Sequence, residues 1–212
     1  MSEIRHHISD NLLTAYAGGS LGHPFALVVA AHVSMCDECR ARLEAHNAVG
    51  GALLDDLNEI KVSDGLRDAV LAGLDDDFDV APAPVRASGV YPAPVAEMLP
   101  LGRPKWKSLG LGTRQSILYD GPEGSARLLY IPAGQAVPDH GHNGLELTLV
   151  LQGSFHDETG GFGVGDVEIA YDDLDHCPTA GTEADCICLA ATDAPLRFHS
   201  FVPRLLQPLF RI

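Results

Sequence analysis

The stretch that decides the fold is Gly134–Gly153, which reads GQAVPDHGHNGLELTLVLQG and has the spacing G-x5-H-x-H-x3-E-x6-G. His140 and His142 are two positions apart, so on a β-strand both side chains point to the same face. Glu146 falls on that face too if the strand continues or turns back in a hairpin. About thirty residues later, His176 offers a fourth ligand. We therefore predict that these four side chains bind one metal ion.

The chain from about Trp106 onward is typical of β-structure. Short apolar segments, often β-branched, alternate there with Gly and Pro turns. The clearest of these segments are Ser116–Tyr119, Ala126–Ile131, Glu146–Leu151 and Cys186–Ala190. Their close spacing predicts an antiparallel β-barrel or jelly roll over residues 105–212.

The ligand types in this half leave the metal open. Imidazole and carboxylate together suit Zn, Fe, Mn, Ni or Cu. Three His and one carboxylate can close a tetrahedral zinc site or leave positions free for oxygen chemistry. A metal is expected there, with zinc, iron, manganese and nickel as candidates.

The N-terminal half, residues 1–80, is predicted to form a small helical bundle. Ser9 or Asp10 can cap a first helix, which Gly18 and Gly19 end. Pro24 suits the first turn of a second helix. A bundle of this size buries little apolar surface by itself, so bound metal would add folding free energy.

Between the two halves the composition changes. An acidic run at Asp75–Asp79 is followed by six of the fourteen prolines between Pro82 and Pro104. We predict an extended, Pro-rich linker over residues 81–104. The predicted fold class is therefore α+β, with a helical domain, a linker and a barrel.

A second metal motif lies in the helical half, where His32, Cys36 and Cys39 have the spacing H-x3-C-x2-C. Residues four apart share a helix face, and two Cys at this spacing can hold one metal at a turn between helices. Thiolate and imidazole favour Zn²⁺, which takes four ligands in a structural site. The fourth ligand is expected to be a nearby His. The candidates are His6, His7, His23 and His46.

The charge of the chain limits its partners. The net charge is −15, and residues 1–100 carry 15 acidic against 6 basic side chains, a net −9. Phosphate groups repel such a surface, so direct binding to nucleic acid or anionic lipid is not expected. The acidic helical half suits a basic protein partner.

The sequence also indicates a compartment. No run of eighteen apolar residues is present, and the N-terminus lacks a basic region followed by an apolar stretch. We expect no membrane span and a cytoplasmic location. The five Cys are an odd number without a signal peptide, which does not fit a disulfide framework. Cys186 and Cys188 share a strand face and could be redox-active, but packing is the preferred interpretation for them and for Cys177.

Two resemblances to known families rest on these motifs. Gly134–Gly153 matches the first cupin motif at every defined position, and Gly165 and His176 fall in register with the second. Tyr171, Asp173 and Ala180 stand where that motif has Pro, Gly and Asn. The H-x3-C-x2-C motif, after a short capped helix with an upstream His, resembles the zinc-binding anti-sigma domain. The combination resembles the ChrR-type anti-sigma factors of the extracytoplasmic-function class.

The resemblance implies two metal sites. In that family the upstream ligand is the second His of a His-His pair, which is His7 in this chain, with His6 as its rival. The implied N-terminal zinc ligands are His7, His32, Cys36 and Cys39. The implied cupin ligands are His140, His142, Glu146 and His176.

The resemblance also implies a function. The helical domain would sequester an extracytoplasmic-function sigma factor and block transcription initiation without catalysis. The cupin domain would be needed for release under oxidative stress such as singlet oxygen, through an oxidant or small-molecule signal. The alternative is a metal-dependent cupin enzyme, of dioxygenase or isomerase type, with a regulatory helical domain.

Overall fold

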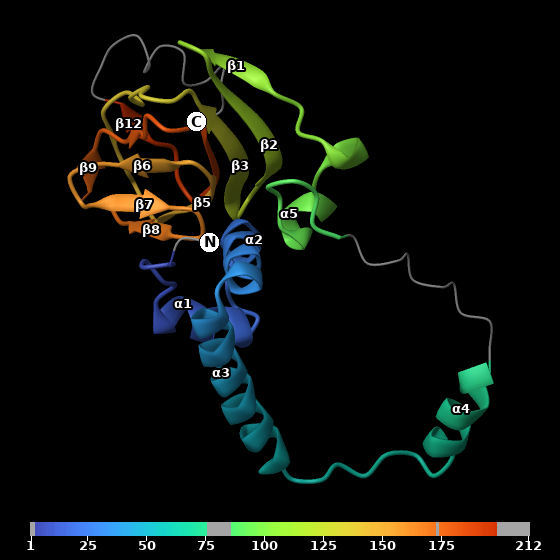
Figure 1. Ribbon diagram of the computed structural model, residues 1–212. Coiled ribbons are helices and arrows are strands. Elements are labelled where there is room, and N and C mark those ends of the chain that lie inside the picture. The colour runs from blue at the N-terminus through green and yellow to red at the C-terminus, as the bar shows by residue number, and fades with distance from the viewer. Residues whose placement is uncertain (1–2, 76–85, 173, 199–212) are drawn as a thin grey trace.

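The computed structural model describes residues 3–75, 86–172 and 174–198, and joins a helical N-terminal part to an antiparallel β-barrel (Figure 1). The predicted α+β class is confirmed. Most of the acidic run, the first part of the predicted linker and the last residues of the predicted barrel domain lie outside the described residues.

The helices begin and end close to the predicted signals. Ser9 precedes the first helix, and Gly18 and Gly19 follow it, with Gly19 at φ +67°. Pro24 stands in the first turn of the second helix, and Cys36 caps the third. The helices of this half are α1 Asp10–Ala17, α2 His23–Met35, α3 Asp37–Asp55 and α4 Leu66–Ala72.

The barrel is built from one large and two small antiparallel sheets. The large sheet has the order β1-β2-β3-β11-β5-β8, and the small ones β10-β6-β7 and β12-β4-β9. All four segments predicted as strands lie within β2, β3, β5 and β11, so that prediction is confirmed. The bounds of the large sheet are β1 Lys107–Gly110, β2 Thr113–Gly121, β3 Gly124–Ile131, β11 Cys186–Thr192, β5 Glu146–Gln152 and β8 Val167–Ala170. Those of the small sheets are β10 Thr179–Ala180, β6 Ser154–His156, β7 Gly161–Gly163, β12 Arg197–Phe198, β4 His140–Gly141 and β9 Asp175–His176.

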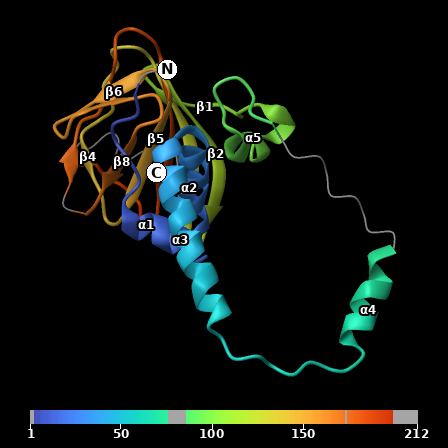
Figure 2. The same cartoon turned by 60° about the horizontal axis from the view of Figure 1, so that its bottom comes forward.

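Alternation along the central strands gives the large sheet two different faces. Leu147 and Leu149 of β5 point to the helical side and are fully buried in one core with Val28 of α2. Glu146 and Thr148, which alternate with them, point the other way into the barrel. Figure 2 shows α2 lying across this sheet, and its contacts are with β3, β5 and β11.

The prediction of an extended linker is wrong for the later part of residues 81–104, which the structure describes. The short helix α5, Ala93–Glu97, and a 3-10 turn at Pro100–Gly102 occupy it, and α5 packs against α2. Val95 and Leu99, four residues apart, are buried in the core that joins the helices to the sheet. The prolines misled the prediction because Pro at the start of a helix costs no hydrogen bond. The domain boundaries at residues 80 and 104 remain a prediction.

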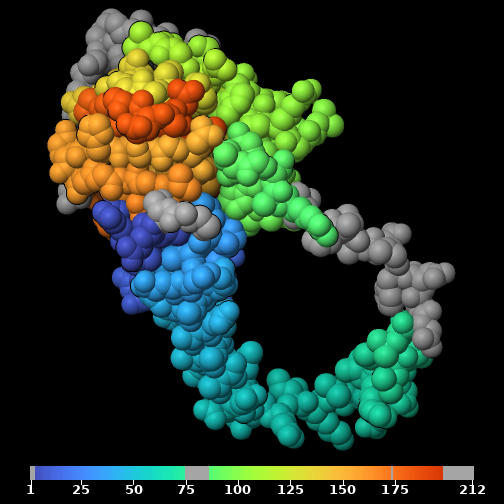
Figure 3. All heavy atoms as spheres, in the orientation of Figure 1, coloured from blue at the N-terminus to red at the C-terminus, as the bar shows by residue number. Residues whose placement is uncertain are grey.

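One part of the helical half does not pack into the hydrophobic core. We call residues Val49–Leu74 the arm: it comprises the end of α3, a connection and α4. In Figure 3 the arm stands away from the body of the molecule, and no residue of α4 is buried. No helix in the described parts of the chain is both long and apolar enough to cross a membrane.

Replacing a leucine of the shared core should destabilise the whole molecule. Leu189 of β11 is fully buried, so Leu189→Ala should lower the free energy of unfolding by about 2–5 kcal/mol. Leu54→Ala is the matched control, because Leu54 in the arm is 69% exposed and should change the value by less than about 0.5 kcal/mol. Urea unfolding followed by circular dichroism measures both, and equal effects would contradict the shared core.

Candidate metal centres

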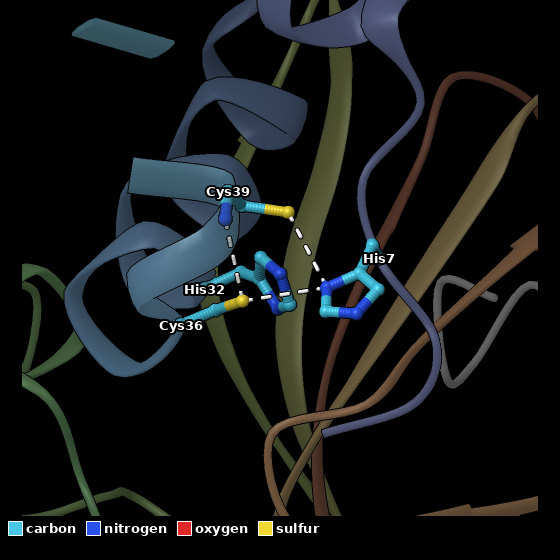
Figure 4. A group of neighbouring side chains, drawn as sticks. All are labelled: His7, His32, Cys36 and Cys39. Carbon is cyan, nitrogen blue, oxygen red and sulfur yellow. Dashed lines mark hydrogen bonds between the residues drawn. The ribbon is translucent and has the colours of Figure 1, made fainter. Parts of the chain in front are cut away.

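Four potential ligands of the helical half meet at one point. His7, His32, Cys36 and Cys39 each offer one ligand atom, and these atoms lie within 4.8 Å of one another. Three of the side chains come from the end of α2 and the start of α3, and His7 comes from the extended segment before α1 (Figure 4). His7 Nδ1 lies 3.3 Å from Cys36 Sγ and 3.6 Å from Cys39 Sγ. A tetrahedral zinc ion with ordinary bond lengths separates its N and S ligands by roughly 3.5 Å, so this donor set fits zinc.

His32 supports this interpretation through an unused nitrogen. Its Nδ1 donates a hydrogen bond of 2.9 Å to the carbonyl oxygen of Gly165, which leaves Nε2 as the lone-pair nitrogen. Nε2 is buried and has no hydrogen-bond partner among the residues that the structure describes. Burial lowers the pKa of His32 to about 4, so the ring is neutral at pH 7 and able to bind a cation. A buried polar atom without a partner is costly, and a metal ion would remove that cost.

Each of the two thiols has a hydrogen-bond donor beside its sulfur. Cys36 is the N-cap of α3, and the backbone N–H of Cys39 donates to its sulfur at 3.4 Å. Arg42 donates to the sulfur of Cys39 at 3.9 Å. Burial raises the pKa of Cys39 to about 11, so a thiolate there needs a cation beside it.

The structure brings His7, and not its rivals, to these thiols. The other nitrogen of His7, Nε2, lies 3.4 Å from Glu38 Oε2. A carboxylate in this position is the usual hydrogen-bond partner for the second ring nitrogen of a metal-binding His. His6 turns the other way, with its ring 4.4 Å from that of Phe162. His23 and His46 also lie elsewhere, beside Tyr119 and Thr14 respectively.

A second cluster lies inside the barrel. His140, His142 and His176 are all buried and place one ring nitrogen each within 4.8 Å of the others. His140 of β4 and His176 of β9 are paired on neighbouring strands. The Nε2 atoms of His142 and His176 are 3.1 Å apart.

Hydrogen bonds orient the rings of this cluster. His140 Nδ1 donates to the carbonyl oxygen of Pro138 at 2.8 Å, and His176 Nδ1 donates to Asp157 Oδ2 at 2.6 Å. Both bonds leave Nε2 as the nitrogen for a metal. Burial lowers the pKa of His140 and of His142, which keeps both rings neutral. The arrangement fits a metal ion held by imidazoles.

Glu146, the fourth predicted barrel ligand, lies beside this group but not within it. Its Oε2 is 3.5 Å from His142 Nδ1, on the side of that ring away from His176, and its Oε1 accepts a hydrogen bond from Thr148. The described residues therefore bring together three of the four predicted barrel ligands. The ligand role of Glu146 stays a prediction.

Sequence reasoning missed the carboxylates that surround the clusters. Asp157 and Glu168 form a buried group with His176 Nδ1, at 2.6 and 3.4 Å. Burial raises the pKa of Glu168 to about 7. Burial lowers the pKa of His176, but the carboxylates of Glu168 and Asp157 outweigh it and raise that pKa to about 9. No spacing could have revealed this group, because its members come from three separate segments. Glu38 did leave a signal, as an acidic residue inside the Cys36-x2-Cys39 motif.

Comparisons with known proteins cover almost the whole chain. A family model described as the ChrR cupin-like domain matches residues 97–195. The anti-sigma-E factor ChrR of Cereibacter sphaeroides is 58% identical over 212 residues, which covers 99% of each chain. A crystal structure of Rhodobacter sphaeroides SigE in complex with the anti-sigma ChrR contains a chain that is 56% identical, with a TM-score of 0.79. That match covers 90% of this chain and 100% of the other.

Replacing His7 should empty the N-terminal centre alone. We expect His7→Ala to lower the metal content of the full chain by about one ion per molecule, because three ligands hold zinc far more weakly than four. His6→Ala is the matched control and should keep both ions, since His6 lies outside the cluster. Elemental analysis after gel filtration measures the stoichiometry. Metal loss in the His6 variant, with the His7 variant fully loaded, would reverse the assignment.

Proposed function

The chain belongs to the ChrR family of anti-sigma factors, and we propose that its helical part binds an extracytoplasmic-function sigma factor and so blocks transcription initiation. The relationship makes it a regulatory protein and not an enzyme, which removes the alternative of a cupin dioxygenase or isomerase. Since RNA polymerase works in the cytoplasm, we also infer a cytoplasmic location.

The observation that supports this proposal is the apolar surface of the arm. Large apolar side chains recur along it, each between 44% and 86% exposed. They are Val49, Leu53, Leu54, Leu57, Ile60, Val62, Leu66, Val70, Leu71 and Leu74. A monomeric protein rarely leaves so many large apolar side chains in water unless a partner covers them. The arm therefore has the composition of a binding segment that packs onto another protein.

Charge supports the same partner. The arm carries five acidic and two basic side chains, within a half of the chain whose net charge is −9. Sigma factors present basic surfaces to DNA, and an acidic segment complements them. By covering those surfaces the arm would exclude both polymerase and promoter. Inhibition of this kind is steric and electrostatic and needs no chemical step.

We propose zinc as the metal of the N-terminal centre, on His7, His32, Cys36 and Cys39. Zinc there would supply folding free energy by tying the segment before α1 to the turn between α2 and α3. For the barrel we propose zinc on His140, His142 and His176, with Glu146 as the fourth ligand. Imidazole and carboxylate would also accept iron, manganese or nickel.

The role proposed for the barrel is release of the sigma factor under oxidative stress such as singlet oxygen, or on binding a small-molecule signal. Its buried histidines and carboxylates form a centre that an oxidant or ligand could alter. Because α2 lies on the barrel's own sheet, a change in the barrel has a short path to the helices.

A charge placed on the arm should weaken sigma binding. Leu53 is 65% exposed, so Leu53→Asp should leave the fold intact and raise the Kd for the sigma factor roughly thirtyfold, or about 2 kcal/mol. Leu111→Asp is the matched control, because Leu111 is 79% exposed but lies on the barrel. Calorimetry with the host's extracytoplasmic-function sigma factors, and with SigE of Rhodobacter sphaeroides as a reference, gives the Kd. If the parent chain binds none of them, the proposed function is wrong.

A point change in the barrel centre should separate inhibition from release. Deleting the barrel is a poor test, because it would expose the buried face of α2. His176→Ala should remove the barrel metal but leave the Kd for the sigma factor within about twofold, since His176 is remote from the arm. It should abolish release when the complex is exposed to singlet oxygen from a photosensitiser. His156→Ala, an exposed His on β6, is the control. Transcription assays that show normal release by the His176 variant would contradict a role for this centre.

A further inference from the structure

Four residues of the barrel lie between the two candidate metal centres. We call Gly165–Glu168, at the start of β8, the β8 link. All four are buried. One end of the link contacts the N-terminal segment and α2, and the other end contacts the barrel cluster.

Asp166 fixes the backbone that presents His7. Its Oδ1 accepts hydrogen bonds from the backbone N–H of Arg5 at 2.6 Å and of His6 at 2.8 Å. The backbone N–H of Val167 donates to the carbonyl oxygen of His6 at 3.2 Å. The two residues immediately before His7 are thus held on the barrel by three hydrogen bonds. Asp166 is only 4% exposed, so water competes little for these bonds.

Gly165 fixes a second candidate ligand. Its carbonyl oxygen accepts the hydrogen bond from His32 Nδ1 that leaves Nε2 facing the thiols. Gly165 has φ +93°, and a Cβ at this position would lie 2.6 Å from Cδ1 of Ile4. A side chain at position 165 would be strained at this φ and would displace the side chain of Ile4. The barrel therefore orients both histidines of the N-terminal centre.

The other end of the link reaches the barrel cluster. Glu168 Oε1 lies 3.4 Å from His176 Nδ1. Val167 and Glu168 also pair with Leu149 and Thr148 of β5, the strand that begins at Glu146. Because backbone paired with a neighbouring strand is stiff, we expect a displacement of His176 to move Glu168 and, through the β8 link, Asp166.

We propose that Gly165 and Asp166 are positioning residues of the N-terminal metal centre, through which the barrel sets how tightly that centre holds its metal. This inference rests on the proposed N-terminal centre and deepens its regulation. A shift of β8 would loosen His7 and His32 together. The two cysteines, which lie on the helices alone, would keep their places.

The test uses the full chain loaded with Co²⁺. Absorption by thiolate-to-cobalt charge transfer reports the N-terminal centre alone, because no cysteine belongs to the described barrel clusters. Asp166→Asn keeps the size of the side chain but offers one acceptor oxygen where three N–H groups, of Arg5, His6 and Gly163, need acceptors. We expect this absorption to disappear in EDTA about tenfold faster than in the parent, the lower end of the effect of losing a residue that orients a metal-binding His.

The matched control is Asp185→Asn. Asp185 likewise accepts a backbone N–H, from Ala133, and a hydroxyl, from Tyr130, but it lies on the barrel away from the N-terminal centre. Its cobalt should leave at the parent's rate. Equal rates for the parent and both variants, or equal acceleration in both variants, would overturn the proposal.

If Asp166→Asn fails to fold, Ile4→Ala takes its place, because it removes only the side chain that packs on Gly165. Faster cobalt loss in this variant supports the proposal, and a parent rate overturns it.

SigE binding, measured in parallel, separates this inference from the proposed function. Without EDTA, all folded variants should bind SigE alike. In EDTA the complex of the Asp166 variant should dissociate first. A parent that does not bind SigE contradicts the proposed function, whereas unchanged cobalt loss with intact binding contradicts only the positioning role.

Discussion

The convergence of His7, His32, Cys36 and Cys39 on one buried point is the constraint on which the rest of the structure depends. Three of the four come from a single helix–turn–helix and meet locally. His7 does not, so the segment before α1 must run back along the barrel to reach them. That path brings Gly165 and Asp166, just before β8, into the surroundings of a centre formed by the helices. The helical part and the barrel are joined there, as well as through the apolar face of α2.

The same constraint divides the helical half into a part that packs against the sheet and the exposed arm. Up to Cys39 the helices are fixed by the cluster and by the sheet, and their apolar side chains are buried. Beyond His46, which still contacts Thr14 of α1, α3 leaves the body, and the arm exposes its large apolar side chains along its length. Nothing in the described chain covers them, and the composition of the arm is not that of a solvated linker. The exposed apolar surface of the arm is therefore best understood as one side of a protein–protein interface, and the packed helices anchor the arm to the barrel.

The barrel holds a group of potential ligands of its own. Its three clustered histidines are buried, and two of the rings are fixed because His140 donates a hydrogen bond to Pro138 and His176 donates one to Asp157. Acidic side chains lie around the cluster. Such a centre can hold a metal firmly. The family to which the chain belongs is regulatory. The strand β8, which carries Glu168 beside His176, is the part of the barrel that links this cluster to the helical half.

The sequence alone determined most of the elements and most of the candidate ligands. Local signals fixed the elements, because strand and helix periodicity act over a few residues. They include the apolar alternation in Glu146–Leu151 and the helix-end residues Gly18, Gly19 and Pro24. The pairing of His32 with Cys36 and Cys39 was also local. Tertiary structure alone places His7, and not His6, beside the thiols, since adjacent residues differ in which side of the chain they face. It also placed α5 among the prolines, Glu146 beside the cluster and not within it, and Glu168 against His176. Those outcomes depend on contacts between segments far apart in the chain, and spacing along one segment carries no information about them.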